Sequence, residues 1–153
     1  ALLGVLAQRL AKRLCAKCKQ VHTASQDEIK PLLEEYCQEL KNTDTWKRDP
    51  KAAYEAIYRE WVKAFADEKG QFTLHTPVGC EACSGTGYKG RVGLHELLIG
   101  SDPIKKLIQE KSRVAEVLAV ALNENMRTLK QDGVEKVLQG VTDMHQVRAV
   151  CIK

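Results

Sequence analysis

The spacing of apolar residues divides the first half of the chain into a helical hairpin and a short strand. Residues 26–41 open with Ser25 and Glu28 at capping-box spacing and continue as an amphipathic stripe. A second helix is predicted from Asp49-Pro50, with Gly70 as its stop. Its aromatic residues recur at helical spacing, which favours a packed pair of helices over a surface that stacks ligands. Residues 72–75 predict a short strand.

The first fourteen residues fit two patterns. Their leucines fall on a helical stripe, but the alternation that ends at Leu14 also fits one face of a strand. We predict the end of a helix up to about Ala7, followed by a strand over residues 8–14. A second strand is expected over residues 91–99, antiparallel to the first.

The last third of the chain predicts four short helices. The first begins at Asp102-Pro103, Ser112 caps the second, the third spans about residues 127–138, and Thr142 caps the last. Because these helices carry their own apolar stripes, we expect residues 103–151 to pack together by themselves.

Four cysteines form two CxxC pairs, and they are the strongest chemical signal in the sequence. Cys15 and Cys18 make the first pair, and Cys80 and Cys83 make the second. Two such turns supply the four thiolates that tetrahedral Zn²⁺ prefers in a closed structural site. Glycines at 85, 87 and 90 follow the second pair and allow the tight, positive-φ backbone of a zinc knuckle.

The distance between the two pairs is unusual. They are separated by 61 residues, 19–79, where a compact zinc ribbon needs about 15 to 20. A folded insert must therefore lie between them, and the helical hairpin supplies it. We expect this insert to be tied to the rest of the chain chiefly through the metal site. The predicted fold is α+β and mostly α, with an antiparallel hairpin that carries the zinc knuckle and the insert, followed by the C-terminal helices.

The same cysteines could also form disulfides or a redox pair. Two disulfides would require an oxidising compartment, but no secretory signal is seen and 29% of the residues are charged. A redox CxxC would need one pair in a thioredoxin-like setting, and the second pair argues against it. His22 and His75 lie nearest to the cysteines and could replace a ligand, yet four thiolates leave them as surface or supporting groups. His95 and His145 are more remote.

The charge is uneven along the chain, although its formal net value is only +4. Residues 1–24 carry five Lys and Arg and no acid, whereas residues 25–70 carry eight bases and eleven acids. A basic start without interleaved aromatics is more often a solvated face or a subunit contact than a nucleic-acid surface. No apolar run approaches the length of a membrane span.

Two motifs bear on catalysis. The GxGxxG spacing of Gly85, Gly87 and Gly90 matches a dinucleotide fingerprint, but that fingerprint needs a strand before it and a helix after it. Here a CxxC precedes it and a strand is predicted after it. No GxxxxGK[ST] phosphate loop is found and no nucleophile lies beside a base, so the sequence predicts no catalytic residues and no cofactor-binding residues.

Three blocks together resemble one family. They are Gly4-Val5-Leu6-Ala7-Gln8-Arg9-Leu10 leading to the first CxxC, Val78-Gly79-Cys80 through Leu98, and Met126-Arg127-Thr128-Leu129 with Asp132-Gly133. In this order they are similar to the C-terminal end of the type II secretion and type IV pilus assembly ATPases. The resemblance covers roughly residues 1–18 and 76–150.

The resemblance implies a domain organisation. Residues 1–100 would be the end of a RecA-like motor core with its tetracysteine subdomain, here with an insert over 25–70. Residues 101–153 would form a C-terminal helical subdomain. Because the chain begins at Ala1 without a methionine, we expect it to have been cut from a longer protein. The segment between the cysteine pairs is about twice the length expected for the family, and what the insert contacts is left open.

The resemblance also implies a parent protein: a hexameric cytoplasmic ATPase, peripheral to the bacterial inner membrane. Its partners would be neighbouring subunits and the inner-membrane platform. ATP and Mg²⁺ would bind only through the upstream core, so only the four zinc ligands carry over. Pilus and secretion machines share these blocks, and the sequence does not separate them.

Two alternatives remain open. A chaperone-like zinc module is one, because Cys80-x-x-Cys83-x-Gly85-x-Gly87 matches one CxxCxGxG repeat of the DnaJ family, which has four. A zinc-stabilised nucleic-acid binder is the other, and it would lose affinity steeply with added salt.

Overall fold

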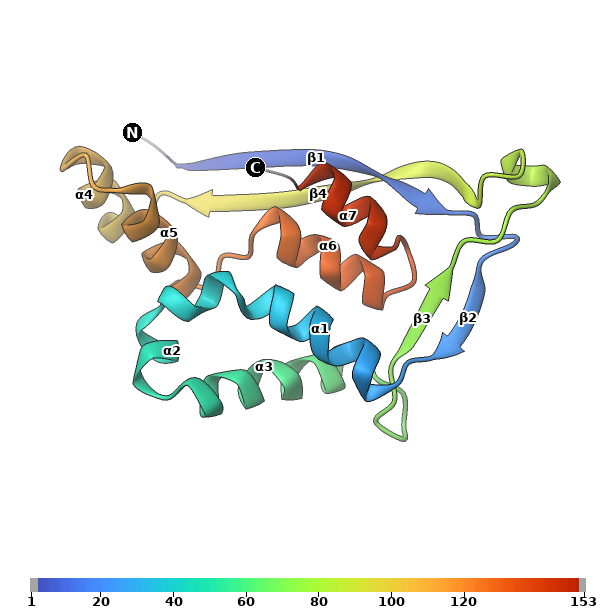
Figure 1. Cartoon of the computed structure of the whole chain (residues 1–153). Helices are drawn as coiled ribbons and strands as arrows, with labels where there is room; N and C mark the ends of the chain where they lie inside the picture. The colour runs from blue at the N-terminus through green and yellow to red at the C-terminus, as the bar shows by residue number, and fades with distance from the viewer. Residues whose placement is uncertain (1–2, 152–153) are drawn as a thin grey trace.

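A long antiparallel ribbon runs along one edge of the molecule (Figure 1). The computed structural model describes residues 3–151, and in it β1 (Gly4–Leu14) pairs with β4 (Tyr88–Ile99). The register joins Gly4 to Ile99 and Lys12 to Arg91, and a bulge follows before Leu14 meets Tyr88. The predicted antiparallel pairing is therefore confirmed.

The predicted helix end up to Ala7 is wrong for residues 4–7, because each of them pairs with β4. Residues 1 and 2 of that prediction lie outside the described residues. The second strand was predicted from residue 91 but begins at Tyr88.

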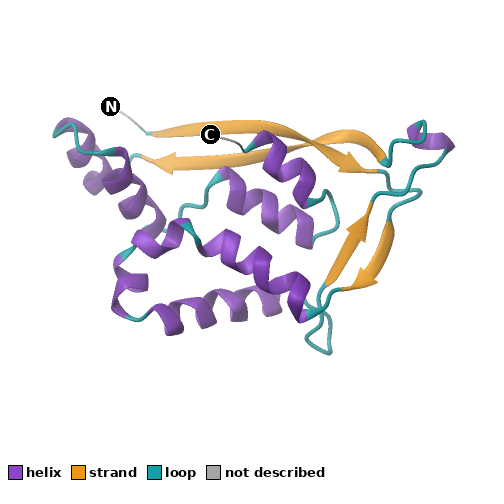
Figure 2. Cartoon of the chain, viewed as in Figure 1, coloured by secondary structure: helices purple, strands orange, loops and turns teal. Residues whose placement is uncertain are grey.

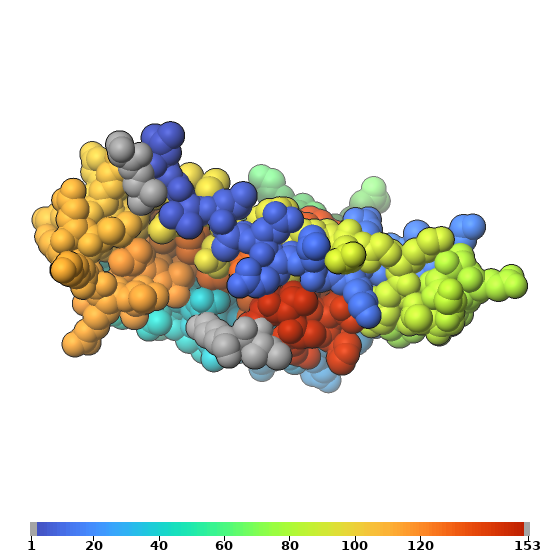
Figure 3. All heavy atoms as spheres, turned by 90° about the horizontal axis from the view of Figure 1, so that it is seen from above, coloured from blue at the N-terminus to red at the C-terminus, as the bar shows by residue number. Residues whose placement is uncertain are grey.

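The two faces of the ribbon differ. Ala11 and Leu94 point inward and are buried, whereas Leu6 and Leu97 on the other face are 61% and 49% exposed. Seen from above, β1 and β4 lie across the surface of an elongated molecule (Figure 3). The leucine pattern that suggested a helix therefore belongs partly to an exposed sheet face.

The segment between the cysteine pairs is folded throughout. Its elements are β2 (Gln20–Thr23), α1 (Gln26–Cys37), the 3-10 helix η1 (Glu39–Asn42), α2 (Asp44–Arg48), α3 (Pro50–Phe65) and β3 (Thr73–Thr76). β2 and β3 form a second antiparallel ribbon, and the predicted helical hairpin is confirmed as α1 and α3 (Figure 2). The sequence missed β2 and α2, which are four and five residues long.

The ends of the hairpin helices partly follow the predicted signals. Ser25 and Glu28 form the predicted capping box of α1, and Asp49 caps α3 through the N–H of Ala52. α1 ends at Cys37 rather than at residue 41, and α3 ends at Phe65 rather than at Gly70. Gly70 instead adopts φ +76° in a loop beyond the helix.

Four helices follow the long ribbon: α4 (Asp102–Gln109), α5 (Val114–Asn123), α6 (Leu129–Leu138) and α7 (Met144–Val150). Two predicted caps are wrong. α5 begins after Arg113 without a side-chain cap, and Asp143 rather than Thr142 caps α7. The Thr142 hydroxyl is buried and donates to the carbonyl of Lys12. The predicted α+β class, mostly α, is confirmed.

One hydrophobic core joins the insert to the C-terminal helices. It contains residues of α1 and α3 such as Leu33 and Trp61, together with Leu122 of α5 and Val134 and Leu138 of α6. The expectation that the insert is held chiefly through the cysteine site is therefore wrong. Apolar packing over the length of the hairpin also holds it.

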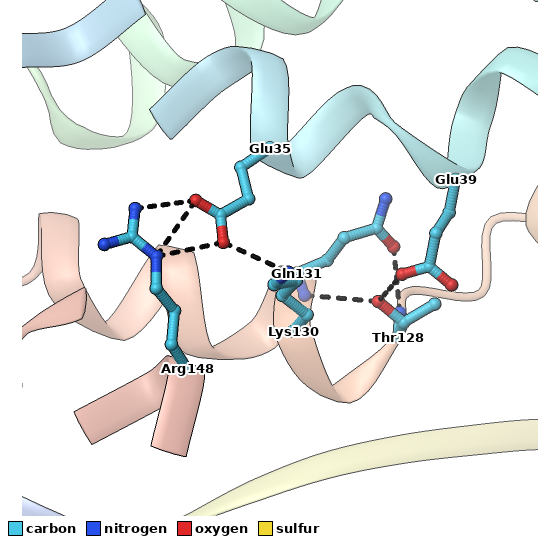
Figure 4. Close-up of polar contacts among 6 residues, drawn as sticks. All are labelled: Glu35, Glu39, Thr128, Lys130, Gln131 and Arg148. Carbon is cyan, nitrogen blue, oxygen red and sulfur yellow. Dashed lines mark hydrogen bonds and ion pairs between the residues drawn. The ribbon is translucent and has the colours of Figure 1, made fainter. Parts of the chain in front are cut away.

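Polar contacts reinforce this packing (Figure 4). The carboxylate of Glu35 in α1 forms two ion pairs, one with the guanidinium of Arg148 in α7 at 2.8 Å and one with Nζ of Lys130 in α6 at 3.1 Å. Glu39 lies one turn after Glu35, and its carboxylate accepts a hydrogen bond from the Thr128 hydroxyl at 3.0 Å.

None of the helices between residues 3 and 151 combines the length and the hydrophobicity that crossing a membrane requires.

Candidate metal centre

The structure brings the four predicted cysteines together at the far end of the long ribbon. Cys15 and Cys18 follow β1, while Cys80 caps the short 3-10 helix η2 (Glu81–Cys83) and Cys83 is its last residue. All four sulfur atoms lie within 4.8 Å of one another. The helical insert leaves and re-enters the fold between these two pairs, so residues far apart in sequence share one point in space.

Three of the sulfur separations test whether the site fits a metal. The Sγ atoms of Cys15 and Cys80, of Cys18 and Cys83, and of Cys80 and Cys83 are each 3.8 Å apart. A tetrahedral Zn²⁺ with Zn–S bonds of about 2.3 Å places its sulfurs about 3.8 Å apart. The sulfurs are too far apart for S–S bonds of about 2.05 Å. The donor set therefore fits Zn²⁺, and zinc as the occupant stays a prediction.

Glycines shape the loop around the second pair. Gly85 and Gly87 have φ of +77° and +84°, which other residues rarely adopt. The loop is also tight, because a Cβ on Gly79 would lie 2.7 Å from the carbonyl oxygen of Gly85. The predicted positive-φ turn beneath the cysteines is confirmed. β4 begins immediately afterwards, so the GxGxxG spacing precedes a strand and not a helix.

Backbone N–H groups point at the sulfur atoms. Gly79 donates to Cys18 at 3.3 Å, and both Cys80 and Gly87 donate to Cys83 at 3.2 Å. Such bonds favour the thiolate, which is the form that binds metal. The loop thus supplies both the ligands and the donors that stabilise their charge.

The pKa values of Cys18 and Cys83 are shifted in opposite directions. Burial alone would raise the pKa of Cys83, but the N–H groups of Cys80 and Gly87 and the neighbouring thiols lower it to about 6. The N–H of Gly79 acts to lower the pKa of Cys18, yet burial and the neighbouring sulfurs raise it to about 11. Four thiolates at this spacing repel one another, so a bound cation is needed to deprotonate all of them.

The other candidate ligands lie elsewhere. His22 pairs with Glu28 at 2.8 Å, and His75 packs against Gly140. Cys37 is buried within the insert, and Cys151 follows α7. Neither the histidines nor these cysteines join the cluster described among residues 3–151.

The sequence missed a second feature of this end of the molecule. The turn between α6 and α7 contacts the metal end of the ribbon, where Lys19 Nζ donates to the carbonyl of Gly140 and the Tyr88 hydroxyl donates to Asp143. No spacing signal in the sequence links Lys19 to Gly140 or Tyr88 to Asp143. Tyr88 follows the glycine-rich turn of the knuckle, but the spacing of that turn does not indicate which residue Tyr88 contacts.

A cavity of about 980 Å³ lies between α1, α5, α6, α7 and the long ribbon. Its carboxylates are already engaged: Glu35 by Lys130 and Arg148, and Glu96 by the N–H of Leu129. The charged groups of this cavity therefore hold elements together.

Comparison with known proteins identifies one family over nearly the whole chain. The family model described as "Type II/IV secretion system protein" matches residues 1–149. The type IV pilus assembly ATPase PilB of Thermus thermophilus is 35% identical over 153 residues, which cover 100% of this chain and 14% of the relative.

Two further relatives are a type IV pilus assembly ATPase and a type II secretion system protein. PilB of Pseudomonas aeruginosa is 30% identical over 147 residues, covering 95% of this chain and 20% of the relative. The type II secretion system protein E of Pectobacterium carotovorum is 33% identical over 146 residues, covering 95% and 22%. The chain thus spans less than a quarter of the length of these relatives. A match along nearly the whole chain places it in the Type II/IV secretion system protein family.

Proposed function

We propose that this chain is a metal-binding, non-catalytic C-terminal region of an ATPase that powers type II secretion or type IV pilus assembly. The observation that carries the proposal is the convergence of four cysteine sulfurs, at the spacing of a tetrahedral site, within a chain that the family model matches over residues 1–149. The relatives named above include ATPases of pilus assembly, which supports the motor assignment.

In this proposal Cys15, Cys18, Cys80 and Cys83 hold Zn²⁺ as a structural ion. The ion neutralises the four thiolates and closes the segment between the cysteine pairs. A structural Zn²⁺ contributes about 10 kcal/mol or more of coupled folding free energy in small domains. Val21 and Val78, near the cysteine loops in the sequence, are 57% and 59% exposed and so add little apolar packing there. The metal would therefore supply the rigidity that this end of the molecule lacks.

The rest of the proposal concerns the longer protein. Residues 1–100 would end a RecA-like motor core and residues 101–153 would form a helical subdomain, in a cytoplasmic hexamer that contacts neighbouring subunits and an inner-membrane platform. The exposed apolar face of the ribbon supports this, since Leu6, Leu10, Leu97 and Ile99 are about half exposed or more and such patches mark surfaces that other protein covers. ATP and Mg²⁺ would bind in the motor core.

The direct test is an ATPase assay of the purified 153-residue chain beside the longer protein that contains it. We expect no turnover from the chain, because it has no phosphate loop, and turnover from the longer protein under the same conditions. ATP hydrolysis that follows the chain through a second column and persists in another expression host would contradict a non-catalytic role. An inactive longer protein with bound zinc would contradict the motor assignment.

A further inference from the structure

The turn between α6 and α7 is held on several sides by residues that adjoin the cysteine site. The N–H of Leu14, next to Cys15, donates to the carbonyl of Val141 at 2.9 Å. Lys19, next to Cys18, donates through Nζ to the carbonyl of Gly140 at 2.8 Å. Figure 1 shows this turn beside the end of β1 and the start of the second ribbon.

The second cysteine pair reaches the same turn. The Tyr88 hydroxyl donates to Asp143 Oδ2 at 2.5 Å. Asp143 is the N-cap of α7, and its other oxygen accepts the N–H of Gln146 at 3.0 Å. Tyr88 thus contacts the residue that starts the helix.

Close packing adds to these hydrogen bonds. Gly140 has φ +80°, and a Cβ placed on it would lie 2.6 Å from Cε1 of His75 in β3. The turn therefore fits against the ribbon that leads from one cysteine pair to the other, without room for a side chain at residue 140.

The contacting groups are positioned by the cysteine loops. Lys19 directly follows a ligand, and Tyr88 directly follows Gly87, whose N–H donates to Cys83 Sγ at 3.2 Å. Lys19 and Tyr88 are not part of the main hydrophobic core, which lies between the insert and α5 and α6. Lys19 lies in the loop between β1 and β2, and Tyr88 is the first residue of β4, where it pairs with Leu14 at the edge of the second cysteine loop. We therefore expect the order of the cysteine loops to affect the positions of both residues.

We propose that metal binding controls the stability of α7, through Tyr88 and Lys19, which fix its N-terminal turn only when the cysteine loops are held by the ion. This inference rests on the metal site proposed above. α7 is short, seven residues, and carries Arg148, whose guanidinium binds Glu35 of the insert. Loss of the ion would therefore loosen the contact between α7 and the insert as well.

The effect can be measured by amide exchange of α7 in the 153-residue chain, with zinc bound and after chelation. Removing zinc should raise exchange over residues 144–150 by about tenfold, which corresponds to about 1.4 kcal/mol of local opening free energy. The charged hydrogen bond to Asp143 accounts for a change of this size. α3 should change by less than about twofold, because it packs in the core away from the site.

Two variants test the named residues. Tyr88→Phe removes the hydroxyl and leaves the ring and the cysteines, so zinc should stay bound while α7 exchanges about as fast as in the chelated protein. The matched control is Tyr58→Phe, because no hydrogen bond is described for the Tyr58 hydroxyl. The second variant is Lys19→Met, which removes the hydrogen bond to the carbonyl of Gly140 and should also raise the exchange of α7. Its control is Lys89→Met. If Tyr88→Phe does not fold, Lys19→Met alone tests the proposal.

The zinc content of every sample separates the outcomes. No bound zinc in the parent chain would overturn both the proposed metal site and this inference. Bound zinc with the same α7 exchange before and after chelation would overturn only the inference. It would also be overturned if Tyr88→Phe and Lys19→Met both kept the full zinc dependence of the parent chain.

Discussion

At the scale of single residues, Gly133 is required by close packing and not by its backbone angle. A Cβ on Gly133 would lie 2.5 Å from Cγ1 of Val147 and 3.2 Å from Cδ1 of Leu94. Both neighbours are fully buried, so neither can move into solvent. The glycine therefore lets α7 and β4 approach α6 at one point.

Gly133→Ala should destabilise the chain despite the better helix propensity of alanine. Overpacking costs about 1–3 kcal/mol, whereas alanine gains about 1 kcal/mol within a helix, so we expect a net loss of up to about 2 kcal/mol, centred near about 1 kcal/mol, in urea unfolding. The companion change Val147→Ala should relieve the clash. A Gly133→Ala variant at least as stable as the parent, or a double variant that shows no coupling, would contradict this explanation.

Single residues also show what could be predicted from the sequence. The paired spacing of the cysteines predicted which four sulfurs converge, and two capping residues, Ser25 and Asp49, were predicted correctly. The caps predicted for α5 and α7 were wrong: α5 begins after Arg113 without a side-chain cap, and the adjacent Asp143 caps α7. Thr142 does not cap α7, because the Thr142 hydroxyl donates a hydrogen bond to the carbonyl of Lys12 in β1. That contact depends on tertiary structure.

At the scale of elements, Glu35 joins α1 to α6 and α7. Its pKa is lowered, first by the hydrogen bond from Arg148 and then by Lys130. Replacing it should therefore cost stability at neutral pH. We expect Glu35→Gln to lose about 1–2 kcal/mol. The matched control is Glu34→Gln, whose carboxylate is 51% exposed and 3.8 Å from Lys41, and which should lose less than about 0.5 kcal/mol.

The pH dependence gives a sharper check. A carboxyl with a lowered pKa in the folded state contributes stability above its unfolded pKa, near 4.5, and loses it as pH falls through the lower folded pKa. The stability gap between the parent and Glu35→Gln, measured by urea unfolding, should therefore be full at pH 7 and shrink below about pH 4.5. If the difference in unfolding free energy between the parent chain and Glu35→Gln stays constant down to pH 3, the stability lost in the variant comes from the shape of the side chain and not from its charge.

Long elements were predicted more reliably than short ones. The helical hairpin and the long strands have enough turns or alternations to show a period. β2 and α2 have too few residues to do so, and β1 was partly read as a helix because leucines at positions 3, 6 and 10 also fit a helical stripe. Pairing with β4 decides between the two patterns, and that pairing is not visible in the sequence of β1 alone.

At the scale of the whole molecule, the insert is held in two places: by the hydrophobic core along its helices and by the cysteine site at its two ends. Side chains from α1 and α3 pack with Leu122, Val134 and Leu138, more than fifty residues later in the chain. The apolar stripes predicted that each helix buries one face, but not which partner it meets. For this reason the prediction from the sequence made the insert depend too strongly on the metal site.

The site itself can be tested by counting zinc in protein purified without chelator, by elemental analysis. We predict one equivalent in the parent chain, one in Cys37→Ser, and close to none in Cys83→Ser. Cys37 is the matched control because it is also a buried cysteine, and burial raises its pKa to about 12. Less than about half an equivalent in the parent chain, or zinc lost from Cys37→Ser and retained in Cys83→Ser, would show that these four sulfurs are not a zinc site.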